Sequence, residues 1–211
     1  MNHKPMLALA VLSGALTGLL PGCGAGTPRP AALDPERLAP ARLYPMRDGY
    51  VWSYNVDTGT GMNTFAVSRV VRAEGDTYAI TNGGEEIVYE VRADGIYRPQ
   101  SGTYLLRAPI EVGATWPGSA GATARVASTT EEVDVQAGHF EGCVLVVEES
   151  SESGRVVRTT YCDGEGPVLV ESTQALTMGE DRTLTVRGEL IGLVRGEEDA
   201  EAPEEYDAPS E

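Results

Sequence analysis

The chain is poor in the residues on which most enzyme and metal sites depend. Its 211 residues include two histidines, three cysteines, two tryptophans and two phenylalanines. Of the two histidines, only His139 lies beyond the first 22 residues. A lone histidine cannot build a histidine-based zinc site, and neither H-E-x-x-H nor G-x-S-x-G occurs. We therefore expect no catalytic residues, no metal and no cofactor, and we expect that the protein is not an enzyme.

Basic residues are also scarce, and none of them form a cluster. The chain has 16 Lys and Arg against 32 Asp and Glu, a formal net charge of -16. Nucleic acids and anionic lipid headgroups are polyanions and would be repelled by this charge. Nucleic acid is therefore excluded as a partner, while a hydrophobic content of 41% is enough for one domain with a core.

The N-terminal segment has the features of an export signal. An apolar run over residues 6–20 is short for a membrane span and ends in Leu20-Pro21-Gly22-Cys23. This motif resembles the bacterial lipobox, which implies a signal peptide over 1–22, lipidation of Cys23 and a membrane-anchored location in the cell envelope. Gly24 favours the outer membrane under the common sorting rule. The alternative is an ordinary signal peptide with an incidental cysteine.

Composition divides the rest of the chain into three parts. Residues 23–43 are rich in Pro, Ala and Gly and predict a flexible linker. Residues 197–211 are acidic, contain no Lys or Arg, and predict a disordered tail. Within residues 44–196, short segments alternate between apolar and polar residues as strands do, and this region predicts a single domain.

That central region predicts an all-β fold. Short β-branched or aromatic segments are separated by Gly, Asn and Asp, and no stretch keeps a helical apolar period. Asp94-Gly95 gives the strongest hairpin signal. We expect one antiparallel domain, either a curved sheet, a half-barrel or a sandwich. The clearest strands are expected at 50–56, 65–71, 86–91, 144–147, 168–172 and 183–187.

Cys143 and Cys162 flank two strand-like segments joined at Ser151-Glu152-Ser153-Gly154. If this loop is symmetric, residues whose numbers sum to 305 face each other, and the two cysteines are cross-strand neighbours. Facing Cα atoms in an antiparallel pair are about 4.5–5.5 Å apart, a separation that a disulfide can span. We predict a structural disulfide between Cys143 and Cys162; a bulge that shifts the register would instead leave two buried thiols.

Both tryptophans follow the same local pattern, P-x-x-x-G-x-x-W, at residues 45–52 and 109–116. Proline sets the entry, glycine permits a tight turn and tryptophan opens the next strand. Trp52 and Trp116 are interpreted as core anchors, with a ligand-stacking pair as the alternative.

Acidic residues offer weak candidates for chemistry. The doublets Glu85/Glu86, Glu131/Glu132 and Glu148/Glu149 have the wrong geometry for a carboxylate pair, because adjacent strand residues point to opposite faces. Carboxylates from separate strands remain possible. Asp163-Gly164-Glu165-Gly166 offers oxygens for calcium but lacks the EF-hand pattern and is interpreted as a plain turn.

Taken in order, several short motifs resemble a group of bacterial secreted β-domains and lipoproteins with no established activity. The group reads Y-P-L-x-x-G-x-x-W, then V-G-x-x-W, then A-G-x-F-x-x-C, then G-x-G-x-V. Here the motifs begin at Tyr44, Val112, Ala137 and Gly164, while Asp163, Glu165 and Cys162 depart from the group. The resemblance implies a curved antiparallel sheet similar to lipoprotein-carrier half-barrels, and it carries no site residues.

Three functions are compatible with these observations. The first is an envelope lipoprotein with a non-enzymatic binding or scaffolding domain, partnered by the membrane through its lipid and by an envelope protein. The second is a carrier that holds a lipid or another hydrophobic ligand in a curved sheet. The third is an unrecognised hydrolase, which would need two carboxylates, or a nucleophile and a base, converging in a cleft.

Overall fold

The structure, a computed structural model, describes residues 35–176 and 182–196. The predicted signal peptide, Cys23, the beginning of the linker and the acidic tail over 197–211 lie outside the described residues.

Almost every described element is a strand. Two short helical turns precede the sheet, η1 (Pro35–Leu38) and α1 (Pro40–Leu43), and a third, η2 (Ser119–Gly121), interrupts it. The strands are β1 (Val51–Asp57), β2 (Asn63–Glu74), β3 (Thr77–Asn82), β4 (Glu85–Arg92), β5 (Gly95–Arg98), β6 (Thr103–Arg107), β7 (Thr115–Pro117), β8 (Thr123–Val135), β9 (Gly138–Glu149), β10 (Val156–Cys162), β11 (Gly166–Leu176) and β12 (Arg182–Val194).

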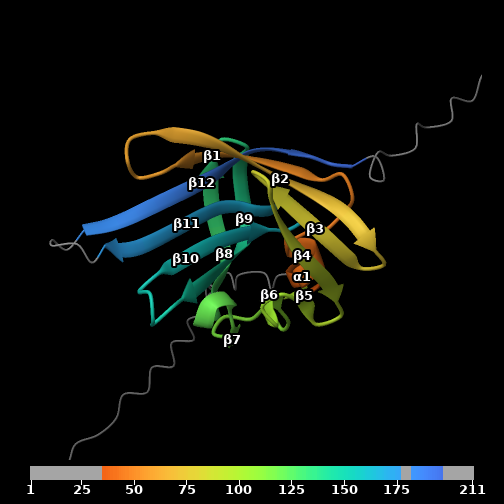
Figure 1. Cartoon of the computed structure of the whole chain (residues 1–211). Helices are drawn as coiled ribbons and strands as arrows, with labels where there is room; N and C mark the ends of the chain where they lie inside the picture. The colour runs from red at the N-terminus through yellow and green to blue at the C-terminus, as the bar shows by residue number, and fades with distance from the viewer. Residues whose placement is uncertain (1–34, 177–181, 197–211) are drawn as a thin grey trace, which may run out of the picture. The chain divides into compact units, whose positions relative to one another are not determined.

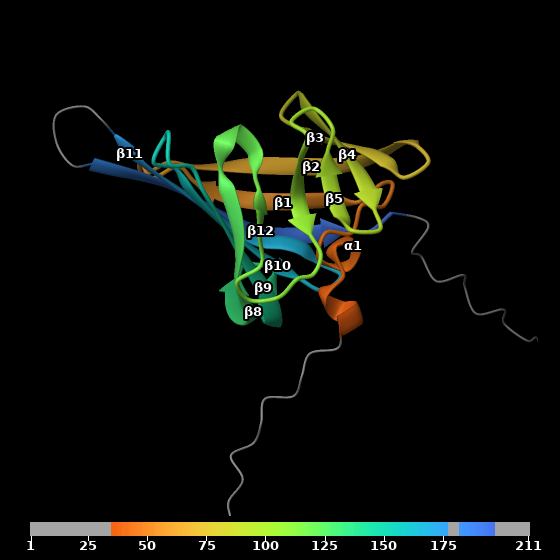
Figure 2. The same cartoon turned by 90° about the horizontal axis from the view of Figure 1, so that it is seen from below.

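The twelve described strands form one antiparallel sheet in the order β6-β5-β4-β3-β2-β1-β12-β11-β10-β9-β8-β7. Sequence neighbours pair except β6 and β7, which are the two edge strands, and β1 pairs with β12, so the first and last strands meet in the middle of the sheet. The sheet curves strongly, and α1 lies within the curve, in contact with β5 and β11 (Figures 1 and 2). The prediction of a single all-β antiparallel domain with a curved sheet is confirmed.

The expected strands and turns lie where the alternation and glycine pattern predict them, with one difference at the β4–β5 hairpin. Arg92 pairs with Gly95, so the turn is Ala93-Asp94 and Gly95 already belongs to β5. A Cβ atom at Gly95 would lie 2.1 Å from the carbonyl oxygen of Leu106 on the neighbouring strand. Glycine is required here by the close approach of β6.

The β8–β9 hairpin carries several bulges. Register shifts occur at three places between Val126 and Val133, and bulges bend the strand that carries them. The hairpin tip then reaches β12, where the Ala137 amide donates a hydrogen bond of 2.9 Å to the Leu190 carbonyl. In Figure 2 the hairpin crosses the direction of β1 and β2.

The prediction that residues 23–43 form a flexible linker is wrong at its C-terminal end. Pro40–Leu43 is a helical turn that begins with proline, where the missing N–H costs nothing, and Leu43 is fully buried. The turn is held by a bidentate contact from Arg42 to Asp163, with N–O distances of 2.6 and 2.8 Å, and by the Gly164 amide on the Arg42 carbonyl. Composition marked a spacer, but one leucine in it belongs to the core.

The two tryptophans are core residues, as predicted. Trp52 is 0% and Trp116 3% exposed, and the glycines before them, Gly49 and Gly113, have φ of 78° and 91°. The indole of Trp52 donates to the Glu165 carbonyl at 2.7 Å. Each repeat of the motif therefore forms a positive-φ turn that delivers a tryptophan into the core.

Candidate functional site

A cavity of about 410 Å³ lies inside the curved sheet. Its wall is formed on one side by β4, β5, β6 and η2, and on the other by β9, β10, β11 and the β9–β10 loop. These strands are far apart in the sheet order, so the cavity exists because the sheet curves back on itself. Its volume is in the range of small-molecule sites.

Charged side chains enter the cavity from both sides. Arg98 comes from β5, Glu148 from β9 and Arg155 from the β9–β10 loop. Glu148 is largely buried, and burial raises the pKa of its carboxyl while Arg98 and Arg155 oppose the rise. The cavity wall therefore combines one carboxyl with two guanidinium groups that favour its ionised form.

Tyrosines form the floor of the cavity. Tyr44 follows α1 and packs against Tyr161 and Tyr89, with ring centroids 6.0 and 6.3 Å away, and all three line the cavity. Burial raises the pKa of the Tyr44 and Tyr161 hydroxyls, so both stay protonated at neutral pH. They are therefore fixed polar groups that can donate a hydrogen bond.

Two buried polar atoms of the cavity wall lack a hydrogen-bond partner among the described residues. They are Nε of Arg98 and Oε1 of Glu148, although Arg98 does donate through its terminal nitrogen to Ser119 Oγ. Unpaired polar atoms in protein interiors are uncommon and call for an explanation such as water or a ligand. Both side chains line the same cavity.

A second hollow of about 280 Å³ adjoins the first. The two share Tyr44, Pro167 and Val170 in their walls. The second is mainly apolar, with side chains from β1, β2 and β12. These include Tyr54, Val56, Ala66 and Val186.

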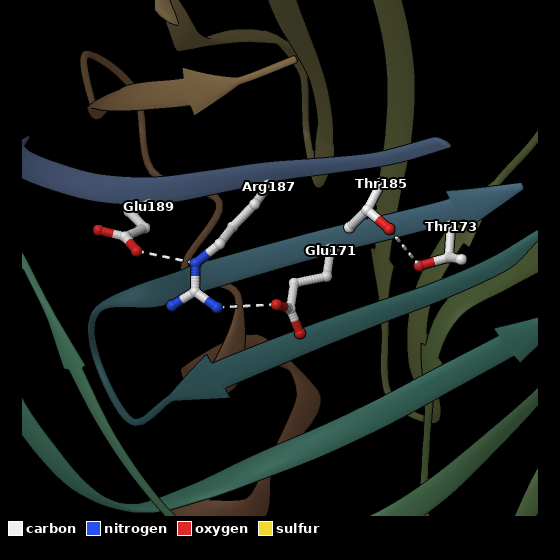
Figure 3. A network of polar contacts seen from close by, with 5 residues as sticks. All are labelled: Glu171, Thr173, Thr185, Arg187 and Glu189. Atoms are coloured by element: carbon white, nitrogen blue, oxygen red, sulfur yellow. Dashed lines mark hydrogen bonds and ion pairs between the residues drawn. The ribbon is translucent and has the colours of Figure 1, made fainter. Parts of the chain in front are cut away.

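The outer face of the sheet carries a different group of charges. Arg187 donates to Glu189 and to Glu171, each at 2.8 Å, and the hydroxyls of Thr173 and Thr185 lie 3.4 Å apart beside them (Figure 3). Val186 and Gly188 line the second hollow, so Arg187 points to the opposite side of the sheet. These charges satisfy one another and take no part in the cavity.

Cys143 and Cys162 form a disulfide, with Cα atoms 4.4 Å apart. The strand register explains the bond: Val144 faces Tyr161 and Glu149 faces Val156, and both pairs sum to 305. The bond joins β9 and β10, which form one wall of the cavity. Cys23 lies outside the described residues.

The weaker sequence candidates do not gather into a site. His139 is exposed on the β8–β9 hairpin, where its ring contacts Asp134 and Glu141. Asp163 pairs with Arg42 and Glu165 with Arg195, so these carboxylates hold the N-terminal turn and the end of β12. Within residues 35–176 and 182–196, no cluster of three potential metal ligands is present.

Of the glutamate doublets, one member proves relevant. Glu148 lines the cavity while Glu149 is exposed, as strand alternation requires. Arg98, Arg155 and the tyrosines were not singled out from the sequence. For the tyrosines, the available signal was their number, nine, in a chain otherwise poor in aromatic residues. The two arginines had no distinguishing signal in the sequence.

Comparison with known proteins adds little. The sequence matches no protein-family model and no curated protein. Among solved structures, one from Bacteroides fragilis, described as an exported protein with a YmcC-like fold, is similar with a TM-score of 0.44 and 16% identity. The match covers 72% of this chain and 98% of that one, and at this TM-score it supports no conclusion about function. No helix among the described residues is long and apolar enough to cross a membrane.

Proposed function

We propose that this chain is a lipid-anchored protein of the cell envelope whose β-domain is a non-enzymatic module that binds a small ligand inside its curved sheet. The observation that carries the binding role is the cavity with Arg98 and Glu148 in its wall, each with a buried polar atom that lacks a partner. Export and lipidation rest on the motif that ends at Cys23. The outer membrane is the favoured location because glycine follows that cysteine.

The absence of catalysis is part of the proposal. Glu148 is the single carboxylate in the described cavity wall, which contains no histidine and no cysteine. A glycosidase needs two carboxylates around the scissile bond, and a hydrolytic nucleophile needs a base beside it. The wall therefore supports binding better than hydrolysis.

A carrier role is the second candidate, and the second hollow favours it. An apolar space next to a polar one suits a ligand with a head and a tail. Much of the interior is filled by side chains such as Trp52, Ile96 and Leu190, all less than 2% exposed, so a ligand of modest size is expected.

Lipidation is tested by Cys23→Ser in cells supplied with a labelled fatty acid. The wild-type chain should carry the label and sediment with membranes, and the variant should lose both properties, because the acyl chains supply the anchoring free energy. Wild-type protein that is unlabelled and freely soluble would overturn the anchor.

The cavity is tested by filling it. Val157 lines the cavity from β10, whereas Arg158 on the same strand is exposed. Val157→Trp should expel any ligand that copurifies from the native envelope, and Arg158→Trp should retain it, as measured by native mass spectrometry. Wild-type protein that never carries or gains a ligand would refute the binding module.

A further inference from the structure

We infer that the cavity takes a small amphipathic oxyanion, with its negative group at Arg98 and Arg155 and its apolar part toward the second hollow. This inference rests on the proposed binding function and names the class of ligand.

The cavity wall has the opposite charge balance to the chain as a whole. The whole chain has twice as many acidic as basic residues, 32 against 16. The cavity wall has two arginines and one glutamate, the reverse ratio. Guanidinium groups present planar forks of N–H donors that match carboxylate, sulfate and phosphate oxygens. A cationic hollow in an acidic protein is suited to an anion.

The cavity wall offers more hydrogen-bond donors than charged acceptors. Beyond the two arginines, the phenols of Tyr44, Tyr89 and Tyr161 line the cavity. Glu148 is the one charged acceptor in the described wall. An acceptor-rich group such as an oxyanion complements this set, whereas an ammonium group would find one carboxylate among two arginines.

Arg98 lacks a hydrogen-bond acceptor for one of its nitrogen atoms. No ion pair joins Arg98 to Glu148 among the described residues, and Nε of Arg98 has no acceptor. Buried guanidinium groups are usually paired because leaving their charge unmatched in a dry environment is costly. Glu148 already stabilises the Arg98 charge through space, so what a ligand oxyanion would supply at this point is the acceptor that Nε lacks.

The apolar part of the ligand follows from the neighbouring space. Leu105 and Val157 flank the charged groups, and Val170 and Pro167 lead into the second hollow with Val56 and Val186 in its wall. A short alkyl chain placed there would bury apolar surface worth about 25 cal/mol per Å². The two spaces together fit a head group and a short tail.

The ligand class is tested with three probes that share one tail. The whole chain in nanodiscs of zwitterionic lipid is titrated calorimetrically with octanoate, octyl sulfate and octanol, against protein-free nanodiscs. Both anions should bind, and octanol should bind at least tenfold more weakly. Equal affinity for all three, or no binding of either anion, overturns the inference.

Variants test the assigned contacts. Arg98→Gln should weaken octyl sulfate binding about tenfold or more, whereas Arg158→Gln on the exposed side of β10 should leave it unchanged. Glu148→Gln should tighten binding severalfold because it removes a like charge, and this sign remains informative even if Arg98→Gln fails to fold. Weaker anion binding by Glu148→Gln would show that the ligand uses Glu148 as an acceptor and would overturn the class.

The two levels of the proposal can fail separately. If both anions fail to bind but an endogenous ligand copurifies and Val157→Trp expels it, the ligand class is wrong and the binding module stands. If no ligand is found by either route, the binding module itself is refuted.

Discussion

Arginine and glutamate side chains are paired with one another on the outer face of this sheet but not on its inner face. On the outer face, Arg187 is held between Glu171 and Glu189 at 2.8 Å and all three side chains are partly open to solvent (Figure 3). On the inner face, Arg98 and Glu148 make no ion pair with each other, and each keeps one buried polar atom without a hydrogen-bond partner among the described residues. The outer group is complete, and the inner group is not.

This difference separates a structural group from a site. Exposed ion pairs contribute little to stability and need no further partner. Buried polar atoms without hydrogen-bond partners are costly, and their presence in the wall of a cavity supports the proposal that a ligand completes them. Substitutions on the two faces should therefore differ in the size of their effect and, for Glu148, in its sign.

The largest contrast is expected between two large aromatic residues, one from each face. Trp52→Ala should destabilise the domain by about 3–5 kcal/mol, because it opens a cavity at a fully buried site and removes the contact to the Glu165 carbonyl. Phe65→Ala, at a residue 75% exposed on β2, should change stability by less than about 0.5 kcal/mol. Urea denaturation followed by circular dichroism measures both, and equal losses would contradict the assignment of the faces.

The second effect concerns the disulfide that joins β9 and β10. Replacing both Cys143 and Cys162 with alanine should cost about 3 kcal/mol, the value expected for a closed loop of this length. The bond also holds the register that keeps Glu148 inside, since a slip by one residue would turn it outward. Denaturation of the double variant, compared with reduced wild-type protein, measures the cost. A loss in the variant that greatly exceeds that of reduced wild type would point to lost packing instead.

Local patterns were sufficient to predict the six strand segments named from the sequence and the disulfide, because both depend on residues close in sequence; the long strand β8 was not singled out. The register of β9 and β10 follows from one symmetric loop, and alternation correctly separated Glu148 from Glu149. Neither rule says which strand face lies inside. The approach of Arg98 on β5 to Glu148 on β9 depends on how the sheet curves back on itself, because β5 and β9 are far apart in the strand order, and local sequence patterns do not say which strands that curvature brings together. Leu43 was missed for a similar reason, since its burial depends on the distant Asp163-Gly164 turn.

The third effect is a gain in stability when a charged residue of the inner face, Glu148, is neutralised. Burial raises the pKa of Glu148, although Arg98 from β5 and Arg155 from the loop oppose the rise, and Tyr161 and Ser119 also face the carboxyl. A raised carboxyl pKa favours folding below the ordinary carboxyl pKa, and this contribution is lost as the pH rises through the raised value. Glu148→Gln should therefore raise the melting temperature at about pH 7, and the gain should shrink near about pH 4.

The matched control is Glu149→Gln, the exposed neighbour on the same strand. It should leave the melting temperature close to that of wild type at both pH values. If Glu148→Gln instead lowers the melting temperature at neutral pH, the Glu148 carboxylate is stabilised by a partner, and the inner face is as complete as the outer one.

The smallest effect is expected from the outer group itself. Arg187→Gln removes two contacts to carboxylates, yet the side chain is 39% exposed, so the cost should be no more than about 1 kcal/mol. Because screening at about 1 M salt shortens the range of such interactions to about 3 Å, the cost should fall when sodium chloride is added. Arg69→Gln, at an exposed residue of β2, gives the background. Urea midpoints at low and high salt measure the difference. If Arg187→Gln lowers the free energy of unfolding by several kcal/mol and added salt does not reduce this loss, the outer charges also support the fold. Incomplete pairing of charges would then not distinguish the cavity from the outer face.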